Sequence, residues 1–128
     1  GEEHPQTLLA ANNYAATLVD LQRFEGARLL TRENLPMARR VLGENDEITL
    51  KMRKIYAASL CEDPAATLDD LREAVMTLEE LARTARRVFG GAHPLTTAME
   101  DNLRQARAAL RARETLAEAM ASTTLGDA

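Results

Sequence analysis

The chain has 128 residues, of which 45% are hydrophobic and only 3% aromatic, and its net charge is −4. This length allows one domain with a modest core, and the lack of period-two runs of β-branched and aromatic residues gives strands little support. The negative charge disfavours a chain devoted to nucleic acid or to an anionic membrane surface, and no apolar run approaches the roughly 18 residues of a membrane helix.

Cysteine usage and the first residue bear on the cellular setting. Cys61 is the single cysteine, which rules out an intrachain disulfide and suits a reducing compartment. No signal peptide is visible, so we expect a cytoplasmic protein. The chain begins with Gly1 rather than with Met, so we expect it to be a fragment of a longer protein.

A short motif at the beginning of the chain recurs twice. The segment 1–8 (GEEHPQTL) returns as 43–50 (GENDEITL) and as 90–97 (GGAHPLTT), at spacings of 42 and 47 residues. A second pair of segments, 38–43 (ARRVLG) and 85–90 (ARRVFG), is nearly identical. A period of about 40 residues is typical of helical repeat arrays. We therefore expect one domain over 1–121, divided into repeat 1 (1–42), repeat 2 (43–89) and a third unit (90–121), and a flexible tail over 122–128.

The first repeat has the pattern of two helices. The His4-Pro5 pair marks a helix start, because proline is tolerated at the first helical position, where its missing N–H has no partner. Apolar residues then recur at three- and four-residue steps, which predicts an amphipathic helix over about 5–20. A similar pattern predicts a partner helix over about 23–42, with Gly43 following it as a C-cap.

Pro36 lies inside the second of these predicted helices. A proline within a helix removes one backbone hydrogen bond and costs about 3 kcal/mol. We therefore expect a kink or a break near residues 32–36, and we interpret it as a local bend on a solvent-facing side rather than as a functional hinge.

The second repeat carries two helix-start signals of its own. Asp46 is a candidate N-cap for a helix over about 47–61. A turn-like segment, 63–66, takes up the additional length of this repeat, and Thr67 with Asp70 forms a candidate capping box for the next helix. That helix ends in the segment that matches the end of the first repeat.

The third unit begins with His93-Pro94 and has no partner helix after it. No Gly or Pro interrupts residues 95–121, which predicts a long final helix. Such a helix would cover the exposed end of the array, as solenoids require for solubility. The small polar residues of 122–128 are expected to form a frayed tail.

The residue pattern gives no support to catalysis. His4 and His93 occupy the same position of the repeated motif, which favours a structural role at the helix entry. No combination of His, Cys and carboxylate residues has the spacing of metal ligands, and there is no Gly-rich phosphate loop. We therefore expect no cofactor, no metal and no enzymatic activity.

Three arginines are spaced along one side of the last helix. Arg104, Arg107 and Arg111 could meet phosphate groups, but no aromatic residue follows Phe89 to stack on bases. Glu100 lies four residues before Arg104 and can pair with it. We therefore expect neither nucleic acid nor membrane among the partners.

Repeat 1 carries four short motifs in order: His4-Pro5-Gln6-Thr7, Asn12-Asn13-Tyr14-Ala15, Arg23-Phe24-Glu25-Gly26-Ala27 and Val41-Leu42-Gly43. These motifs resemble tetratricopeptide repeats, in particular the 42-residue type of kinesin light chains. Repeat 2 shares Tyr56-Ala57 and Val88-Phe89-Gly90 with this pattern but has Asp46-Glu47 in place of His-Pro. The third unit keeps His93-Pro94, Thr96 and Asn102-Leu103.

The resemblance implies a right-handed superhelix of antiparallel helical hairpins, with two repeats and a long C-terminal capping helix. In this repeat type the first helix of each hairpin lines a concave groove, which implies a protein-interaction module that binds a peptide or a partner helix there. The positions that the resemblance places on this face are Leu9, Asn12, Ala16, Val19, Asp20, Lys51, Lys54, Ala58, Cys61, Glu62, Ala98, Asp101, Gln105, Ala108 and Ala109.

Some of these residues have a plausible role in recognition. The amides of Asn12 and Asn13 can both donate to and accept from a peptide backbone, although Asn13 could instead bridge neighbouring helices. Lys51, Arg53 and Lys54 could hold an acidic peptide, or could form a solvated face paired with nearby acids.

Two other functions known or possible for such repeats are a carboxylate clamp and a structural role. Chaperone-binding members of the family use a Lys and an Asn one turn apart in the first repeat, where this chain has Asn12 and Ala16, so we do not expect a carboxylate clamp. The alternative function is structural: the chain could stack end to end or self-associate as a segment of a longer repeat protein.

Overall fold

The computed structural model describes residues 3–126, and this part of the chain is built from helices alone. It contains no strand, so the predicted all-α class is confirmed. Gly1, the first residue of the repeated motif, lies outside the described residues. The helices are α1 (Glu3–Asp20), α2 (Phe24–Val41), α3 (Glu47–Cys61), α4 (Leu68–Phe89) and α5 (Pro94–Gly126).

Side-chain caps begin α3 and α4 where the sequence predicts them. The Asp46 carboxylate accepts a hydrogen bond from the Ile48 N–H at 2.9 Å. Thr67 Oγ1 accepts from the Asp70 N–H at 3.1 Å, and the Asp70 carboxylate accepts from the Thr67 N–H at 3.0 Å. These bonds occupy backbone donors that have no partner within the helix, and they fix where each helix begins.

Glycines with positive φ end α2 and α4. Gly43 has φ +100° and Gly90 has φ +93°, a region that other residues enter only at a cost. Each glycine closes one of the two matching segments, 38–43 and 85–90. In both copies the glycine turns the chain after the helix, although α2 ends at Val41 and α4 ends at Phe89, one motif position later.

α2 runs through Pro36 without interruption, so of the expected kink or break near 32–36 the break is wrong. Pro36 itself is exposed, whereas Leu35 and Ala38 on the other side of the helix are buried. The carbonyl that loses its donor is that of Arg32, four residues earlier, which is an exposed residue that water can reach. Core packing on one side and solvation on the other keep the helix continuous.

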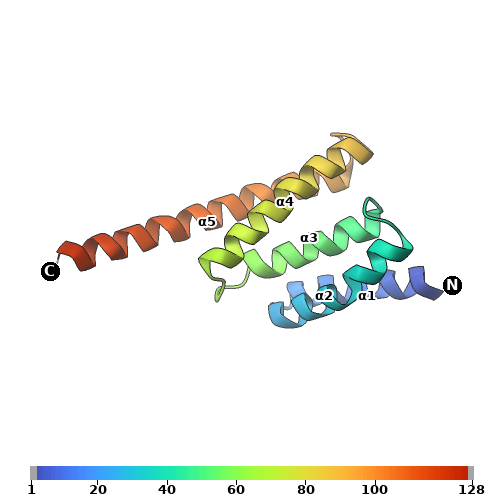
Figure 1. Ribbon diagram of the computed structural model, residues 1–128, viewed down its shortest axis with the longest axis horizontal. Coiled ribbons are helices and arrows are strands. Elements are labelled where there is room, and N and C mark those ends of the chain that lie inside the picture. Colours follow the sequence, from blue (N-terminus) through green and yellow to red (C-terminus); the bar gives the residue numbers. More distant parts are fainter. Residues whose placement is uncertain (1–2, 127–128) are drawn as a thin grey trace.

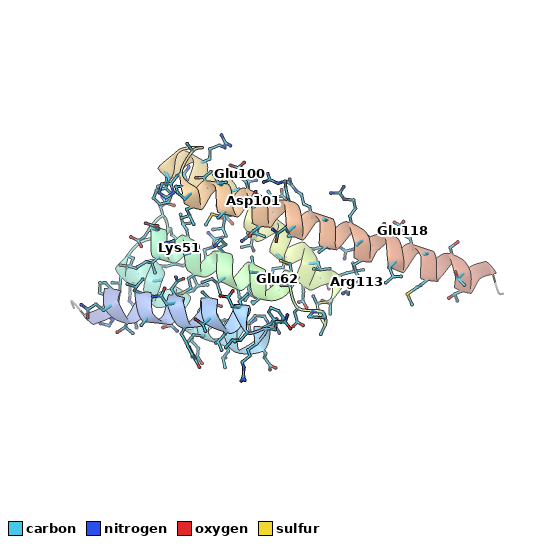
Figure 2. All side chains as sticks on the ribbon, turned by 180° about the vertical axis from the view of Figure 1, so that it is seen from behind. Lys51, Glu62, Glu100, Asp101, Arg113 and Glu118 are labelled. Carbon is cyan, nitrogen blue, oxygen red and sulfur yellow. The ribbon has the colours of Figure 1, made fainter. Side chains whose placement is uncertain are left out.

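Successive helices pack against one another as antiparallel neighbours (Figure 1). α1 also contacts α3, and α3 also contacts α5, whereas the backbones of α2 and α4 are not close neighbours within the described part of the chain. The helices thus form two layers, α1, α3 and α5 in one and α2 and α4 in the other. Figure 2 looks onto the layer of α1, α3 and α5.

The core lies between these layers in two clusters. The larger joins α3, α4 and α5, and the smaller joins α1, α2 and α3. Fully burying a Leu or Met side chain stabilises the fold by about 1.5–3 kcal/mol. The largest fully buried apolar side chains are Leu8, Leu50, Met52, Leu78, Leu81 and Met99.

α5 is longer than its packing requires. Leu110 still packs against the core cluster, but Leu116 and Met120 are 55% and 62% exposed. Figure 1 shows the C-terminal half of α5 extending beyond the other helices. The helix continues to Gly126, past residue 121 where we expected the tail to begin, and residues 127–128 lie outside the described part.

Candidate binding surface on the α1, α3 and α5 layer

The two histidines belong to the packing of the helix entries. His93 Nδ1 accepts a hydrogen bond from the Leu95 N–H at 3.0 Å and so caps α5. Its ring stacks on that of Phe89, with centroids 4.7 Å apart. His4 Nδ1 lies 3.3 Å from the Met37 sulfur instead. Among the described residues no group of three or more His, Cys, Asp or Glu could hold a metal ion.

The single thiol is poorly suited to nucleophilic attack. Burial, and to a smaller extent the neighbouring Glu62 carboxylate, raises the pKa of Cys61 to about 11. The thiolate is the reactive form, so very little of it is present near neutral pH. That the chain is not an enzyme stays a prediction.

The layer of α1, α3 and α5 contains a cavity of about 210 Å³ that all three helices line. Most of the lining residues are among those that the resemblance places on the concave face. Ile55 and Asn102 are additional. The full lining is Ala16, Val19, Asp20, Lys54, Ile55, Ala58, Glu62 and Asn102.

Asn102 could have been found from the sequence. It lies four residues after Ala98 and three before Gln105, and both of these were already assigned to the groove side of the last helix. Residues three and four apart share one side of a helix. Ile55 gave a weaker signal, because an isoleucine in an apolar pattern is expected in the core rather than at a cavity wall.

Three charged side chains, those of Asp20, Lys54 and Glu62, line this cavity. Burial raises the pKa of Glu62, as does the nearby Asp20 carboxylate, while Lys54 lowers it. Burial also lowers the pKa of Lys54, helped by Lys51 and opposed by Glu62. No ion pair within 4 Å involves Asp20, Lys54 or Glu62 in residues 3–126. Glu62 is exposed by surface area, yet the surrounding protein still displaces enough water to weaken its ionisation.

The predicted cationic cluster is divided in the structure. Lys51 pairs with Glu47 one turn earlier, at 3.0 Å. Arg53 reaches the other layer and pairs with Glu80 of α4, also at 3.0 Å. Lys54 alone lines the cavity. Arg53 therefore lies apart from the other two cations, whereas Lys51 is close enough to Lys54 to lower its pKa.

The two predicted asparagines lie in different surroundings. Asn12 is 6% exposed, and no hydrogen-bond donor in the described part of the chain reaches its Oδ1. Asn13 is exposed, and its main-chain carbonyl accepts from the Thr17 hydroxyl at 3.0 Å. Neither residue lines the cavity itself.

The remaining predicted residues do not line the cavity. Leu9 and Gln105 are exposed, and Asp101 pairs with Arg104 on the next turn of α5. In Figure 2, Lys51 and Glu62 lie toward opposite ends of α3, and Asp101 lies on α5.

A larger cavity, of about 620 Å³, lies between α1 and α2. Its walls are mainly apolar and include Tyr14, Leu18, Phe24 and Leu29. This cavity was not predicted from the sequence, although Tyr14, an aromatic residue outside the apolar pattern of the first helix, was a usable signal. Its lining comes from the α1–α2 hairpin and from Asp63 in the loop between α3 and α4. The smaller cavity instead is lined by three helices and has unpaired charges in its wall.

Comparison with protein-family models, with curated proteins and with solved structures gave no match. Within the described residues, no helix combines the length and the apolar character that a membrane crossing requires.

Proposed function

We propose that this chain is a tetratricopeptide-type interaction module that binds a peptide or helix of a protein partner on its α1, α3 and α5 layer. The observation that carries the proposal is the cavity of about 210 Å³, where one helix of each unit contributes lining residues. Cavities with apolar walls and a few convergent polar groups are the usual form of binding sites. A cytoplasmic setting belongs to the same proposal, because Cys61 is a free thiol.

Matching burial in the two hairpins supports the repeat assignment. Ala27 and Ala74, which are equivalent in the two repeats, are both fully buried, and so are Ala38 and Ala85. Small residues at such positions let neighbouring helices approach closely. This equivalence is expected if α1–α2 and α3–α4 are copies of one unit and α5 begins a third, stacked in a right-handed superhelix.

The cavity suggests how a partner would be held. Val19 and Ile55 supply apolar walls that a partner side chain could cover, and the Asn102 amide can donate to or accept from a peptide backbone. A few well-packed side chains carry most of the energy in such interfaces. We therefore assign affinity to side chains that enter the cavity and selectivity to its charged groups.

Peptides selected from a random display library on the immobilised chain provide the test. Ala58→Arg places a long side chain in the cavity, and Ala112→Arg places the same side chain on the exposed side of α5. We expect Ala58→Arg to lower the affinity of selected peptides about tenfold or more, and Ala112→Arg to leave it unchanged. Selection of no peptide, or equal binding to both variants, would contradict the proposal; circular dichroism checks that each variant is folded.

Self-association is a second candidate, favoured by apolar residues that stay exposed at both ends of the array. Tyr14 is 60% exposed in α1, and Leu116 and Met120 are similarly exposed in α5. Contiguous apolar patches often mark protein–protein contact sites. Sedimentation velocity over a wide concentration range, with Leu116→Glu as comparison, tests this role: a monomer at every concentration contradicts it.

A further inference from the structure

The charges that line the α1–α3–α5 cavity are unbalanced. Asp20 and Glu62 bring two carboxylates, and Lys54 brings one ammonium group. Asp20 raises the pKa of Glu62, which shows that the two carboxylates repel each other. Lys54 forms no ion pair within 4 Å with either carboxylate in residues 3–126. A second cation at the cavity would relieve this repulsion, whereas an anion would add to it.

The walls of the cavity suit a long side chain with an apolar stem. Val19 and Ile55 provide branched apolar surface, and Ala16 and Ala58 leave space between the helices. A volume of about 210 Å³ exceeds by severalfold the ~30 Å³ of one water molecule. Lysine and arginine bury their methylene stems against apolar surface while the charged end meets polar groups.

One turn along α1 from the cavity lining, a buried acceptor has no hydrogen-bond donor among the described residues. Asn12 Oδ1 has no donor, although the residue is only 6% exposed. Asn12 precedes Ala16 by four residues and Val19 by seven, which places it on the side of α1 that carries these two cavity residues. An unsatisfied buried acceptor is unfavourable, so a partner that lies along this side of α1 and donates hydrogen bonds would be favoured.

We infer that the cavity is a subsite for one cationic side chain, a lysine or arginine of the protein partner, held between the carboxylates of Asp20 and Glu62. This inference rests on the proposed interaction function and names the chemistry of the partner. Asn102 provides a further acceptor at the same cavity, which suits the several donors of a guanidinium group. Lys54 limits the site to a single additional charge.

A small probe tests the subsite without a selected peptide. We would titrate the full, isotope-labelled chain with Nα-acetyl-arginine amide and, as matched probes, with the acetyl amides of norleucine and glutamate. The arginine probe should shift the backbone amide signals of Asp20, Ala58 and Asn102 and saturate in the millimolar range, as expected for a ligand of about 15 heavy atoms. The norleucine and glutamate probes should bind more weakly.

Charge substitutions give the sign of the interaction. Glu62→Gln and Asp20→Asn should each weaken the arginine probe about two- to fivefold, and Lys54→Gln should strengthen it by a similar factor. Glu33→Gln, an exposed acid of α2, serves as the control and should have no effect. Opposite signs, stronger binding of the glutamate probe, or no saturable shift would overturn the inference. The peptide display experiment tests the proposed function separately. Selected peptides that lose affinity with Ala58→Arg but keep it with Asp20→Asn and Glu62→Gln would refute the cationic subsite and leave the proposed function standing.

Discussion

Two buried threonines connect the beginning of one helix with the end of the helix before it. Thr96 Oγ1 donates to the Gly90 carbonyl at 2.8 Å, and Thr49 Oγ1 donates to the Ala38 carbonyl at 3.3 Å. Both side chains are fully buried and both occupy the same place in the repeated motif. The motif therefore carries a hydrogen-bonded seam between hairpins in addition to its helix-start signal.

Replacing the Thr96 hydroxyl tests this seam. Thr96→Val keeps the shape of the side chain but leaves the Gly90 carbonyl without that donor, so we expect the free energy of unfolding to fall by about 1–2 kcal/mol. Urea denaturation measures the change. Thr49→Val should cost less, because its hydrogen bond is longer, and the exposed Thr115→Val should cost under about 0.5 kcal/mol. An unchanged stability for Thr96→Val would refute the seam.

The burial of Cys61 predicts how its rate of alkylation depends on pH. Its folded pKa of about 11 lies above the ~8.5 of an unfolded chain. The rate of alkylation by iodoacetamide should therefore keep rising from pH 8 to 10 in the native protein, whereas in urea it should level off above about pH 9. The contribution of this thiol to stability is complete below about pH 8.5 and is lost as the pH rises toward 11. A native rate that levels off near pH 8.5 would contradict this account.

At the scale of the helix, α2 shows tertiary packing overriding a local preference. One side of α2 is buried at Ala27, Thr31, Leu35 and Ala38. These buried residues lie both before and after Pro36 in the chain. The packing holds the helix together across the missing hydrogen bond. The sequence alone predicted a kink or a break because it shows the proline but not the surface against which the neighbouring residues pack.

Pro36→Ala should stabilise the protein. Alanine restores the N–H that can bond the Arg32 carbonyl and has the highest helix propensity, a gain reduced by the greater freedom of the unfolded chain. We expect a net increase of about 1–2 kcal/mol in the free energy of unfolding, measured by urea denaturation. Glu33→Ala, an exposed change in the same helix, should stay within about 0.5 kcal/mol. A destabilised Pro36→Ala protein would show that the ring itself contributes to the packing.

Helix boundaries could be predicted wherever a short-range signal sets them. Asp46 and the Thr67–Asp70 pair begin α3 and α4, and Gly43 and Gly90 end α2 and α4, each through contacts with residues close in sequence. The C-terminal end of α5 carries no such signal. Its continuation through the small polar residues 122–126 was therefore not predicted.

At the scale of the whole molecule, the alternation of helices between two layers places the candidate site. The resemblance to tetratricopeptide repeats implied that Ala16, Asp20, Lys54 and Ala58 share one face of α1 and α3, and in the structure these four line one cavity. The orientation of Arg53 could not be predicted, because its partner, Glu80, lies on a different helix. Salt bridges between elements depend on packing that no local pattern specifies.

The most direct test of the binding surface is to map a selected peptide onto the full chain by the shifts of its backbone amide signals. The account predicts the largest changes at Ala16, Lys54, Ala58 and Asn102, because these residues line the cavity in the α1, α3 and α5 layer. Changes concentrated instead at Tyr14 and Leu29, or along the projecting half of α5, would contradict it and place the interaction on another surface.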